Sequence, residues 1–235
     1  HLINIYDKPM IYYPLSLMFL LGIKKIYIVT NKKDIPKFQK IIPSKMLKKN
    51  LITFVIQDQP KGILDGLKKC SKFFKKNDIL LMLGDNFIYG SFLISNLKKI
   101  FNKNKKTSQA LTFMTDSPEK YGIFFENKNK VIEKPKKLSS GLAVLGIYYL
   151  KNNVLNNLSN LKKSKNGEYE ISSLLNLLLR EKKINFNNLS RSILWWDCGT
   201  FQDLHEASLF VSNMQKNNKN KIADLNEILK KNDTF

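Results

Sequence analysis

Apolar and polar residues alternate along the first hundred positions in a way that predicts helices and strands in turn. The run from Pro9 to Leu21 is apolar enough for a buried helix, and Gly22 is a usual helix stop. Three strands and three amphipathic helices are expected to follow: strands at 25–30, 52–57 and 79–83, and helices at 33–42, about 63–74 and 92–101. Such alternation predicts a parallel sheet with helices on both faces.

The stretch from Ile79 to Asn86 is the most informative of these. Five uninterrupted apolar residues are followed by Gly-Asp-Asn, which is typical of a central strand buried on both faces that ends abruptly in polar groups. Gly84 allows a turn or a close approach to a ligand, and Asp85 is the first carboxylate beyond the strand. Ligands bind at this end of the strands in open α/β sheets, so Asp85 is a candidate site residue.

After Gln109 the pattern changes to short strands with few helices between them. We expect strands at 110–114, 123–126, 130–133, 142–150 and 184–189, and helices at 153–158, 171–180, 202–215 and 222–229. The sequence contains no repeat and no linker rich in Pro, Gly or Ser. We therefore expect one compact unit over residues 1–216 and a Lys/Asn-rich helical tail over residues 217–235.

Composition indicates a folded chain of an ordinary kind. Its 235 residues are 43% hydrophobic and 11% aromatic, which excludes intrinsic disorder. No apolar run is long enough for a transmembrane helix, and the start lacks the layout of a signal peptide. The two cysteines form no CxxC pair, which favours a cytoplasmic protein, and two histidines make a His-rich zinc site implausible.

The formal net charge of +21 allows two interpretations. One is a nucleic-acid-binding protein, and the other is a solvated basic surface. The lysines are spread along the whole chain among asparagines and isoleucines, and they are not clustered with aromatic residues. We favour the solvated surface and expect no nucleic-acid or membrane partner. Such a field would still attract phosphorylated small molecules.

Polar residues stand at the ends of several predicted strands. They are Gln57, Asp85, Glu133 with Lys134, and Asp197 after two tryptophans. If the strands are parallel neighbours, these groups converge on one edge. Two aspartates could then share Mg²⁺, which prefers oxygen ligands. Lys134 could hold a phosphate, and Gln57 could use its paired donor and acceptor to read a nucleobase. This combination suits phosphoryl or nucleotidyl transfer.

Each of these residues also has a purely structural interpretation. An aspartate after a strand, such as Asp85, is more often a turn residue or helix cap, and Glu133 alone would suggest a surface turn. Trp195 and Trp196 are more often core residues than a substrate platform. Cys198 is expected to be a small buried residue, because no His–Asp pair accompanies it.

Longer motifs favour the functional interpretation. In order and at similar spacing, the chain resembles the glucose-1-phosphate thymidylyltransferases in these segments: Ile5-Tyr6-Asp7-Lys8-Pro9-Met10-Ile11-Tyr12-Tyr13-Pro14-Leu15-Ser16, Leu83-Gly84-Asp85-Asn86, Pro118-Glu119-Lys120-Tyr121-Gly122, Glu133-Lys134-Pro135, Gly146-Ile147-Tyr148, Gly167-Glu168-Tyr169-Glu170-Ile171 and Trp196-Asp197-Cys198-Gly199-Thr200. The resemblance spans nearly the whole chain. The first segment is highly specific and favours the thymidylyl type over related sugar nucleotidyltransferases.

The resemblance implies an α/β, Rossmann-like three-layer nucleotidyltransferase fold with a mixed, mostly parallel sheet. It implies attack by glucose 1-phosphate on the α-phosphorus of dTTP, giving dTDP-glucose and pyrophosphate, for deoxysugars such as rhamnose in surface polysaccharides such as lipopolysaccharide. It also implies a homotetramer. By the same resemblance, Lys134 and Asp85 would be catalytic, Asp85 and Asp197 would hold Mg²⁺, Gln57, Pro60, Gly62 and Asp85 would face the nucleotide, and Asn86, Tyr121, Gly122, Glu133, Lys134, Gly146 and Tyr148 would face the sugar phosphate.

The chain departs from this family at several positions. The Gly-rich loop G-G-x-G-T-R-L that the family carries before the position of His1 is not in the sequence, and its backbone N–H groups would cradle the triphosphate. We therefore expect a fragment of a longer product or a decayed copy, with little or no synthase activity. Asn166 replaces a common Arg, Asp65 a common Gln and Cys198 a common Thr. The alternative function is a non-catalytic paralogue that binds a nucleotide sugar or regulates an active subunit.

Overall fold

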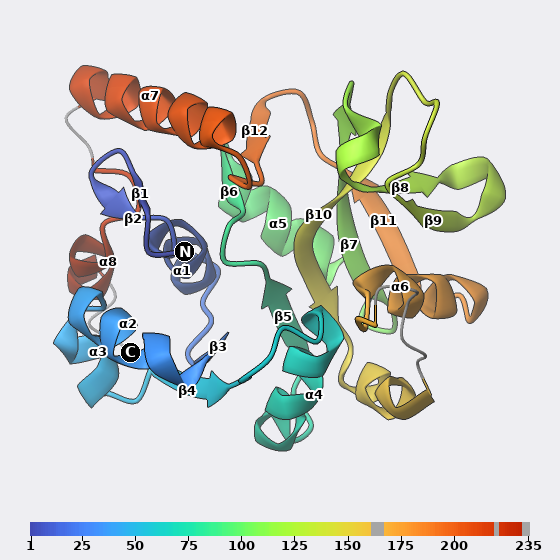
Figure 1. The fold of residues 1–235 in the computed structure, drawn as a ribbon, viewed down its shortest axis with the longest axis horizontal. Coiled ribbons are helices and arrows are strands. Elements are labelled where there is room, and N and C mark those ends of the chain that lie inside the picture. The colour runs from blue at the N-terminus through green and yellow to red at the C-terminus, as the bar shows by residue number, and fades with distance from the viewer. Residues whose placement is uncertain (161–166, 219–220, 232–235) are drawn as a thin grey trace. The chain divides into compact units, whose positions relative to one another are not determined.

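The computed structural model describes residues 1–160, 167–218 and 221–231, and Figure 1 shows its fold. The chain divides into two compact units, whereas we expected one. The first unit contains residues 1–54, 82–98 and 192–235, and the second unit contains residues 55–81 and 99–191. Three of the crossings between units fall inside β4, β5 and α5, so no linker marks them in the sequence.

The first unit combines helices with short strand pairs. Its elements are β1 (Asn4–Ile5), β2 (Lys8–Pro9), α1 (Tyr12–Leu20), β3 (Ile26–Thr30), η1 (Lys32–Asp34), α2 (Ile35–Ile41), α3 (Ser44–Lys48), the start of β4 (Ile52–Ile56), β6 (Phe87–Gly90), the start of α5 (Leu93–Asn102), β12 (Ile193–Trp196), α7 (Phe201–Asn218) and α8 (Leu225–Lys231). β1 pairs with β2, β3 with β4, and β12 with β6. α1 ends just before Gly22, whose φ of +91° is the left-handed conformation that commonly terminates helices.

The second unit is built on a larger sheet. Its elements are α4 (Ile63–Phe74), β5 (Ile79–Met82), β7 (Ser108–Thr115), η2 (Pro118–Lys120), β8 (Gly122–Phe125), η3 (Glu126–Lys128), β9 (Lys130–Glu133), β10 (Gly141–Leu150), η4 (Asn152–Asn160), α6 (Ile171–Arg180) and β11 (Ile184–Asn188). The strand order is β11-β7-β10-β8-β9, with β5 also paired to β10. β11 runs parallel to β7, whereas β7, β8 and β9 join the sheet through antiparallel pairings.

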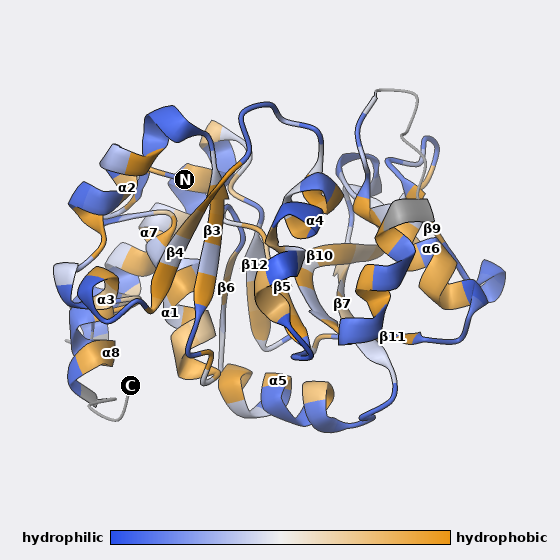
Figure 2. Ribbon diagram, turned by 90° about the horizontal axis from the view of Figure 1, so that it is seen from below, coloured by the Kyte–Doolittle hydropathy of each residue, from blue (hydrophilic) through white to orange (hydrophobic). Residues whose placement is uncertain are grey.

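Each unit buries its own hydrophobic clusters. In the second unit, α6 packs its leucines with residues of β10 and of η4. In the first unit, one cluster joins α1, β3 and α8, and another joins the β1–β2 pair, β6 and α7. Figure 2 shows β4 and β10 as largely hydrophobic, whereas apolar and polar residues alternate along α5. This is the pattern expected for buried strands and for a helix with one apolar face.

The α/β class with a mixed sheet is confirmed, and most predicted elements are present within a few residues. The parallel character is weaker than expected, because the described pairings with a defined register are antiparallel except that of β11 with β7. The expected strand at Ile79 is also less buried than predicted, with only Ile79 itself fully buried. Among the described helices, none combines the length and apolar character needed to cross a bilayer.

Candidate active site

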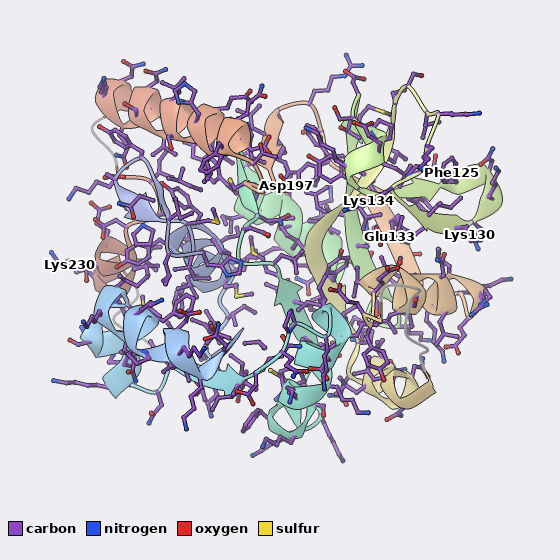
Figure 3. All side chains as sticks on the ribbon, in the orientation of Figure 1. Phe125, Lys130, Glu133, Lys134, Asp197 and Lys230 are labelled. Carbon is purple, nitrogen blue, oxygen red and sulfur yellow. The ribbon has the colours of Figure 1, made fainter. Side chains whose placement is uncertain are left out.

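Two of the predicted aspartates meet at one end of a strand pair in the first unit. β6 and β12 run antiparallel, and their register places Phe87 opposite Trp196. Asp85 lies two residues before Phe87, and Asp197 directly follows Trp196. Both carboxylates therefore lie at the same end of this pair, and Figure 3 labels Asp197 there. We call Asp85 and Asp197 the carboxylate pair.

A hydrogen-bonded chain of side chains supports the first member of this pair. The indole N–H of Trp195 donates to Asn86 Oδ1 at 2.9 Å, and Asn86 Nδ2 donates to Asp85 Oδ1 at 3.0 Å. Asn86 is only 3% exposed, so these bonds are shielded from competing water. Phe87 stacks on Trp196 with ring centroids 5.4 Å apart. Trp195 and Trp196 are both half-buried, and they contact Asn86 and Phe87, the two residues that follow Asp85.

The electrostatics of the carboxylate pair indicate an excess of negative charge. Burial, together with the nearby carboxylates of Asp203 and Asp85, raises the pKa of Asp197. The same three aspartates add to burial in raising the pKa of Cys198 to about 12, so this buried thiol is not a nucleophile, as the sequence suggested. Asp197 also accepts a 3.2 Å hydrogen bond from the Gly199 N–H.

This geometry fits a magnesium ion that completes its shell with other oxygens. In the part of the chain that the structure describes, no group of three or more His, Cys, Asp or Glu side chains could hold a metal ion. The carboxylate pair offers two negatively charged groups that repel one another. A bound cation would offset this repulsion. Mg²⁺ typically binds through one or two carboxylates, waters and substrate phosphates. The residues present therefore fit Mg²⁺ bound together with a phosphorylated ligand.

In the second unit, Glu133 and Lys134 lie against Tyr121 and Gly122. The β8–β9 register sets Gly122 opposite Glu133, and the Lys134 N–H donates to the Tyr121 carbonyl at 2.8 Å. A Cβ at position 122 would lie 3.3 Å from both carboxylate oxygens of Glu133. Gly122 therefore leaves the space that the Glu133 carboxylate occupies. Lys134 has a φ of +44°, a left-handed conformation that is unusual for a residue with a side chain.

Glu133 belongs to a wider group that we call the glutamate cluster, formed by Glu133, Tyr148, Glu170 and Ser172. Burial and the nearby Glu170 raise the pKa of Glu133, while a hydrogen bond with Ser172 and the charge of Lys134 offset part of this effect. Tyr148 is 3% exposed, and burial beside Glu133 raises the pKa of its hydroxyl. Figure 3 shows Glu133 near the start of α6, which carries Ser172.

Gly146, another predicted sugar-side residue, lies in an irregular part of the same sheet. The register of β10 against β7 shifts between Val144 and Tyr148, so β10 carries two more residues than its partner strand there. Such a bulge changes the direction of side chains and is common next to active sites.

The predicted nucleotide-side residues gather where β4 leads into α4. Gln57 Nε2 donates to Asp65 Oδ2 at 2.8 Å and to the Gly62 carbonyl at 3.3 Å. Gly62 has a φ of +90° and packs against the backbone of Tyr169, so a Cβ would lie 2.6 Å from the Tyr169 carbonyl oxygen. Pro60 is exposed within the same turn. We call Gln57, Gly62 and Asp65 the glutamine cluster.

The structure brings the predicted residues together in three groups, with the carboxylate pair in the first unit and the two clusters in the second unit. The segment from Tyr169 to Ser172 links two of these groups, because Tyr169 touches Gly62 while Glu170 and Ser172 influence Glu133. The sequence did not indicate the contacts that Asp65, Ser172, Trp195 and Asp203 make with these residues. Glu170 could have been found, since it stands within a family motif. Asn166 lies outside the described residues.

The sequence of the chain matches one protein family over most of its length. The family model described as nucleotidyl transferase matches residues 1–214. The chain belongs to the nucleotidyl transferase family. The family motifs recognised in the sequence contain both residues of the carboxylate pair, together with Glu133, Lys134, Tyr148 and Glu170.

Individual relatives and solved structures show which members of the family the chain is similar to. The chain is 32% identical over 231 residues to a glucose-1-phosphate thymidylyltransferase from Neisseria meningitidis, covering 97% of this chain and 80% of the relative. It is 34% identical over the same coverage to one from Neisseria gonorrhoeae. A crystal structure described as a glucose-1-phosphate thymidylyltransferase from Bacillus anthracis in complex with a sucrose is 28% identical, with a TM-score of 0.79 over 89% of this chain and 85% of that one. A UDP-glucose pyrophosphorylase with UDP-glucose shares the fold, at 22% identity and a TM-score of 0.77 over 91% of this chain and 90% of its own.

Proposed function

We propose that this nucleotidyl transferase moves a thymidylyl group from dTTP to glucose 1-phosphate, giving dTDP-glucose and pyrophosphate. The observation that carries the proposal is the likeness, at 32% and 34% identity over 97% of the chain, to relatives named for this reaction. The three groups of side chains support it. The carboxylate pair supplies oxygens for a metal, the glutamate cluster supplies a carboxylate with neutral donors for a sugar, and the glutamine cluster supplies an amide for a base. Lys134, which follows Glu133 in the chain, supplies an ammonium group for a phosphate.

Roles for the residues follow from their surroundings. Asp85 and Asp197 would hold Mg²⁺, which neutralises phosphate charge when it is bound. The Trp195–Asn86 hydrogen bonds keep the Asp85 carboxylate in one orientation. Lys134 offers its ammonium group to the phosphate of glucose 1-phosphate as a point charge.

The glutamate cluster suits a sugar because it combines an acceptor with donors. The Glu133 carboxylate can accept hydrogen bonds from sugar hydroxyls, and Tyr121, Gly122, Gly146 and Tyr148 would complete the sugar side. Gln57, Pro60 and Gly62 would form the base side. Positioning of this kind supplies most of the catalysis in phosphoryl-type transfer.

The pathway, the cellular compartment and the oligomeric state are part of the same proposal. The product would serve deoxysugar synthesis, such as rhamnose for lipopolysaccharide, in the cytoplasm. Two buried cysteines without a disulfide support a reducing compartment. A homo-oligomer, with four subunits by resemblance, is proposed on the family likeness alone.

The test is a substrate panel with the full natural protein. Pyrophosphate release is measured with dTTP, UTP, CTP and ATP, each paired with glucose 1-phosphate, mannose 1-phosphate or N-acetylglucosamine 1-phosphate, in the presence of Mg²⁺. We expect dTTP with glucose 1-phosphate to give the highest rate, and removal of Mg²⁺ by EDTA to abolish it. The same panel run on the 235-residue chain tests the expectation of little or no turnover, which robust turnover would contradict. A clear preference for another pair, or no product from any pair, would overturn the proposal.

A further inference from the structure

Helix α6 carries a single asparagine in a run of leucines. Asn176 is flanked by two leucines on one side and three on the other, at a position where leucine would favour the helix more. Its half-buried amide makes two hydrogen bonds with one residue of β9. The Val131 N–H donates to Asn176 Oδ1 at 2.8 Å, and Asn176 Nδ2 donates to the Val131 carbonyl at 2.9 Å. The asparagine therefore holds the backbone of a strand.

These two bonds take the place of a neighbouring strand. β9 lies at the end of the strand order in the described part of the sheet, and Figure 1 shows it beside α6. Lys134 directly follows β9 and donates its N–H to Tyr121, which precedes β8. Because successive residues of an antiparallel strand turn their backbone groups to opposite edges, Val131 turns its own toward α6. Val131 is 3% exposed, so its N–H and carbonyl need these partners.

The same face of α6 also contacts Glu133. Ser172 lies four residues before Asn176, one helical turn away, and forms the hydrogen bond with Glu133 described above. Glu133 lies two residues after Val131, so both side chains leave β9 on one face. Four residues of helix span about 6 Å, and two residues of strand span about 7 Å. The two contacts therefore match in spacing, and together they fix β9 along α6 in one register.

We propose that Asn176 is a positioning residue for the sugar side of the site. Its two hydrogen bonds hold the outer edge of β9 against α6, so that the Glu133 carboxylate stays at Ser172 and Lys134 stays at the end of the strand. Without the amide, β9 keeps its pairing with β8, but its outer edge can move away from α6. This inference rests on the proposed function, because it takes Glu133 and Lys134 to face glucose 1-phosphate.

The test compares the steady-state kinetics of the full natural protein with those of Asn176→Leu. Leucine is close to asparagine in size and suits a helix, but it can make neither hydrogen bond. The KM for glucose 1-phosphate should rise about tenfold, the scale of one misplaced hydrogen bond to a ligand, while the KM for dTTP should change by less than about twofold. Amide hydrogen exchange at Val131 should speed up at least about tenfold, because its N–H loses its acceptor.

Two further variants separate positioning from stability. Asn152→Leu is the matched control, because Asn152 is also half-buried in the second unit and its amide donates to the carbonyls of Lys75 at 2.9 Å and Asn77 at 2.8 Å. It removes two hydrogen bonds to backbone but should leave both KM values and the exchange at Val131 unchanged. Asn176→Asp replaces Asn176→Leu if that variant does not fold. It sets an oxygen against the Val131 carbonyl and should also raise the KM for glucose 1-phosphate.

The results distinguish this inference from the proposed function. An active parent whose Asn176 variants keep the same KM for glucose 1-phosphate would overturn the role of Asn176 and leave the proposed function intact. An equal rise in both KM values, or the same rise for glucose 1-phosphate in Asn152→Leu, would also overturn it, since the effect would then follow from lost stability. No turnover of dTTP with glucose 1-phosphate by the parent would overturn the proposed function and this inference with it.

Discussion

Replacement of Gly62 by alanine is expected to destabilise the second unit by about 3 kcal/mol. Gly62 has a φ of +90°, which a residue with a Cβ adopts only at a cost. A Cβ at this position would also lie 2.6 Å from the carbonyl oxygen and 2.8 Å from the nitrogen of Tyr169. These are backbone atoms, so no side-chain rotation can relieve the contact.

The expected loss of stability in Gly62→Ala is the sum of two effects. Gly62 combines a φ of 90° with a ψ of 170°, a conformation that only glycine adopts readily, and it costs alanine at least about 1 kcal/mol. Relief of the contact moves the Tyr169 backbone, which donates to the Lys61 carbonyl at 3.0 Å and accepts from the Leu64 N–H at 3.4 Å. Weakening these two hydrogen bonds costs about 1 kcal/mol each.

The assay is urea unfolding, with Gly167→Ala as the matched control. Gly167 lies in the same unit at a φ of +78°, and a Cβ there would meet no atom within 4 Å. This control should show the conformational cost of about 1 kcal/mol without the contact. The variants should also differ in hydrogen exchange at Tyr169, where only Gly62→Ala should speed exchange. If Gly62→Ala lost no more stability than Gly167→Ala, the argument from the contact would be refuted.

Three further predictions concern polar groups. Trp195→Phe removes the indole donor to Asn86 and should lower the unfolding free energy by about 1 kcal/mol in urea titrations; an unchanged midpoint would contradict the role of this bond. Burial raises the pKa of Asp78, but hydrogen bonds and the charge of Lys151 outweigh it and lower the pKa overall. Asp78→Asn should therefore cost about 1 kcal/mol at neutral pH, and the difference from the parent should vanish as the pH falls through the lowered pKa; a cost that persists in acid would argue against this. Burial raises the pKa of Glu133, so its ionisation disfavours the fold as the pH rises. Glu133→Gln should then be more stable than the parent at pH 7, with the gain disappearing below the ordinary Glu pKa, and a variant less stable than the parent at pH 7 would count against the assignment.

The sequence was sufficient for the fold class and for most elements because their periodicity is strong. α4 and α6 follow a clear helical pattern, and the apolar run of β10 is unmistakable. β6 was not predicted, because its four residues follow the Gly-Asp-Asn turn so closely that they look like part of the loop. α3 was also missed, since five residues are too few to establish a helical period.

The candidate site was predictable in its members but not in its contacts. Asp85 and Asp197 carry motifs that mark them, yet their meeting depends on the register of β6 with β12, which no local pattern encodes. Likewise, nothing near Gln57 announces that Asp65 will hold its amide. Long-range pairing and side-chain orientation arise from packing, and a single sequence contains no direct record of them.

The β6–β12 pair has a consequence for how the protein folds while the ribosome synthesises it. Asp85 is synthesised before Asp197, and the strand that brings Asp197 beside it, β12, follows β6 only after the whole second sheet has been made. Until then β6 lacks β12 along one edge, and its aromatic residues lack Trp196. The nascent chain is therefore expected to offer chaperones a hydrophobic edge until β12 has been made, and the acidic centre can assemble only after that.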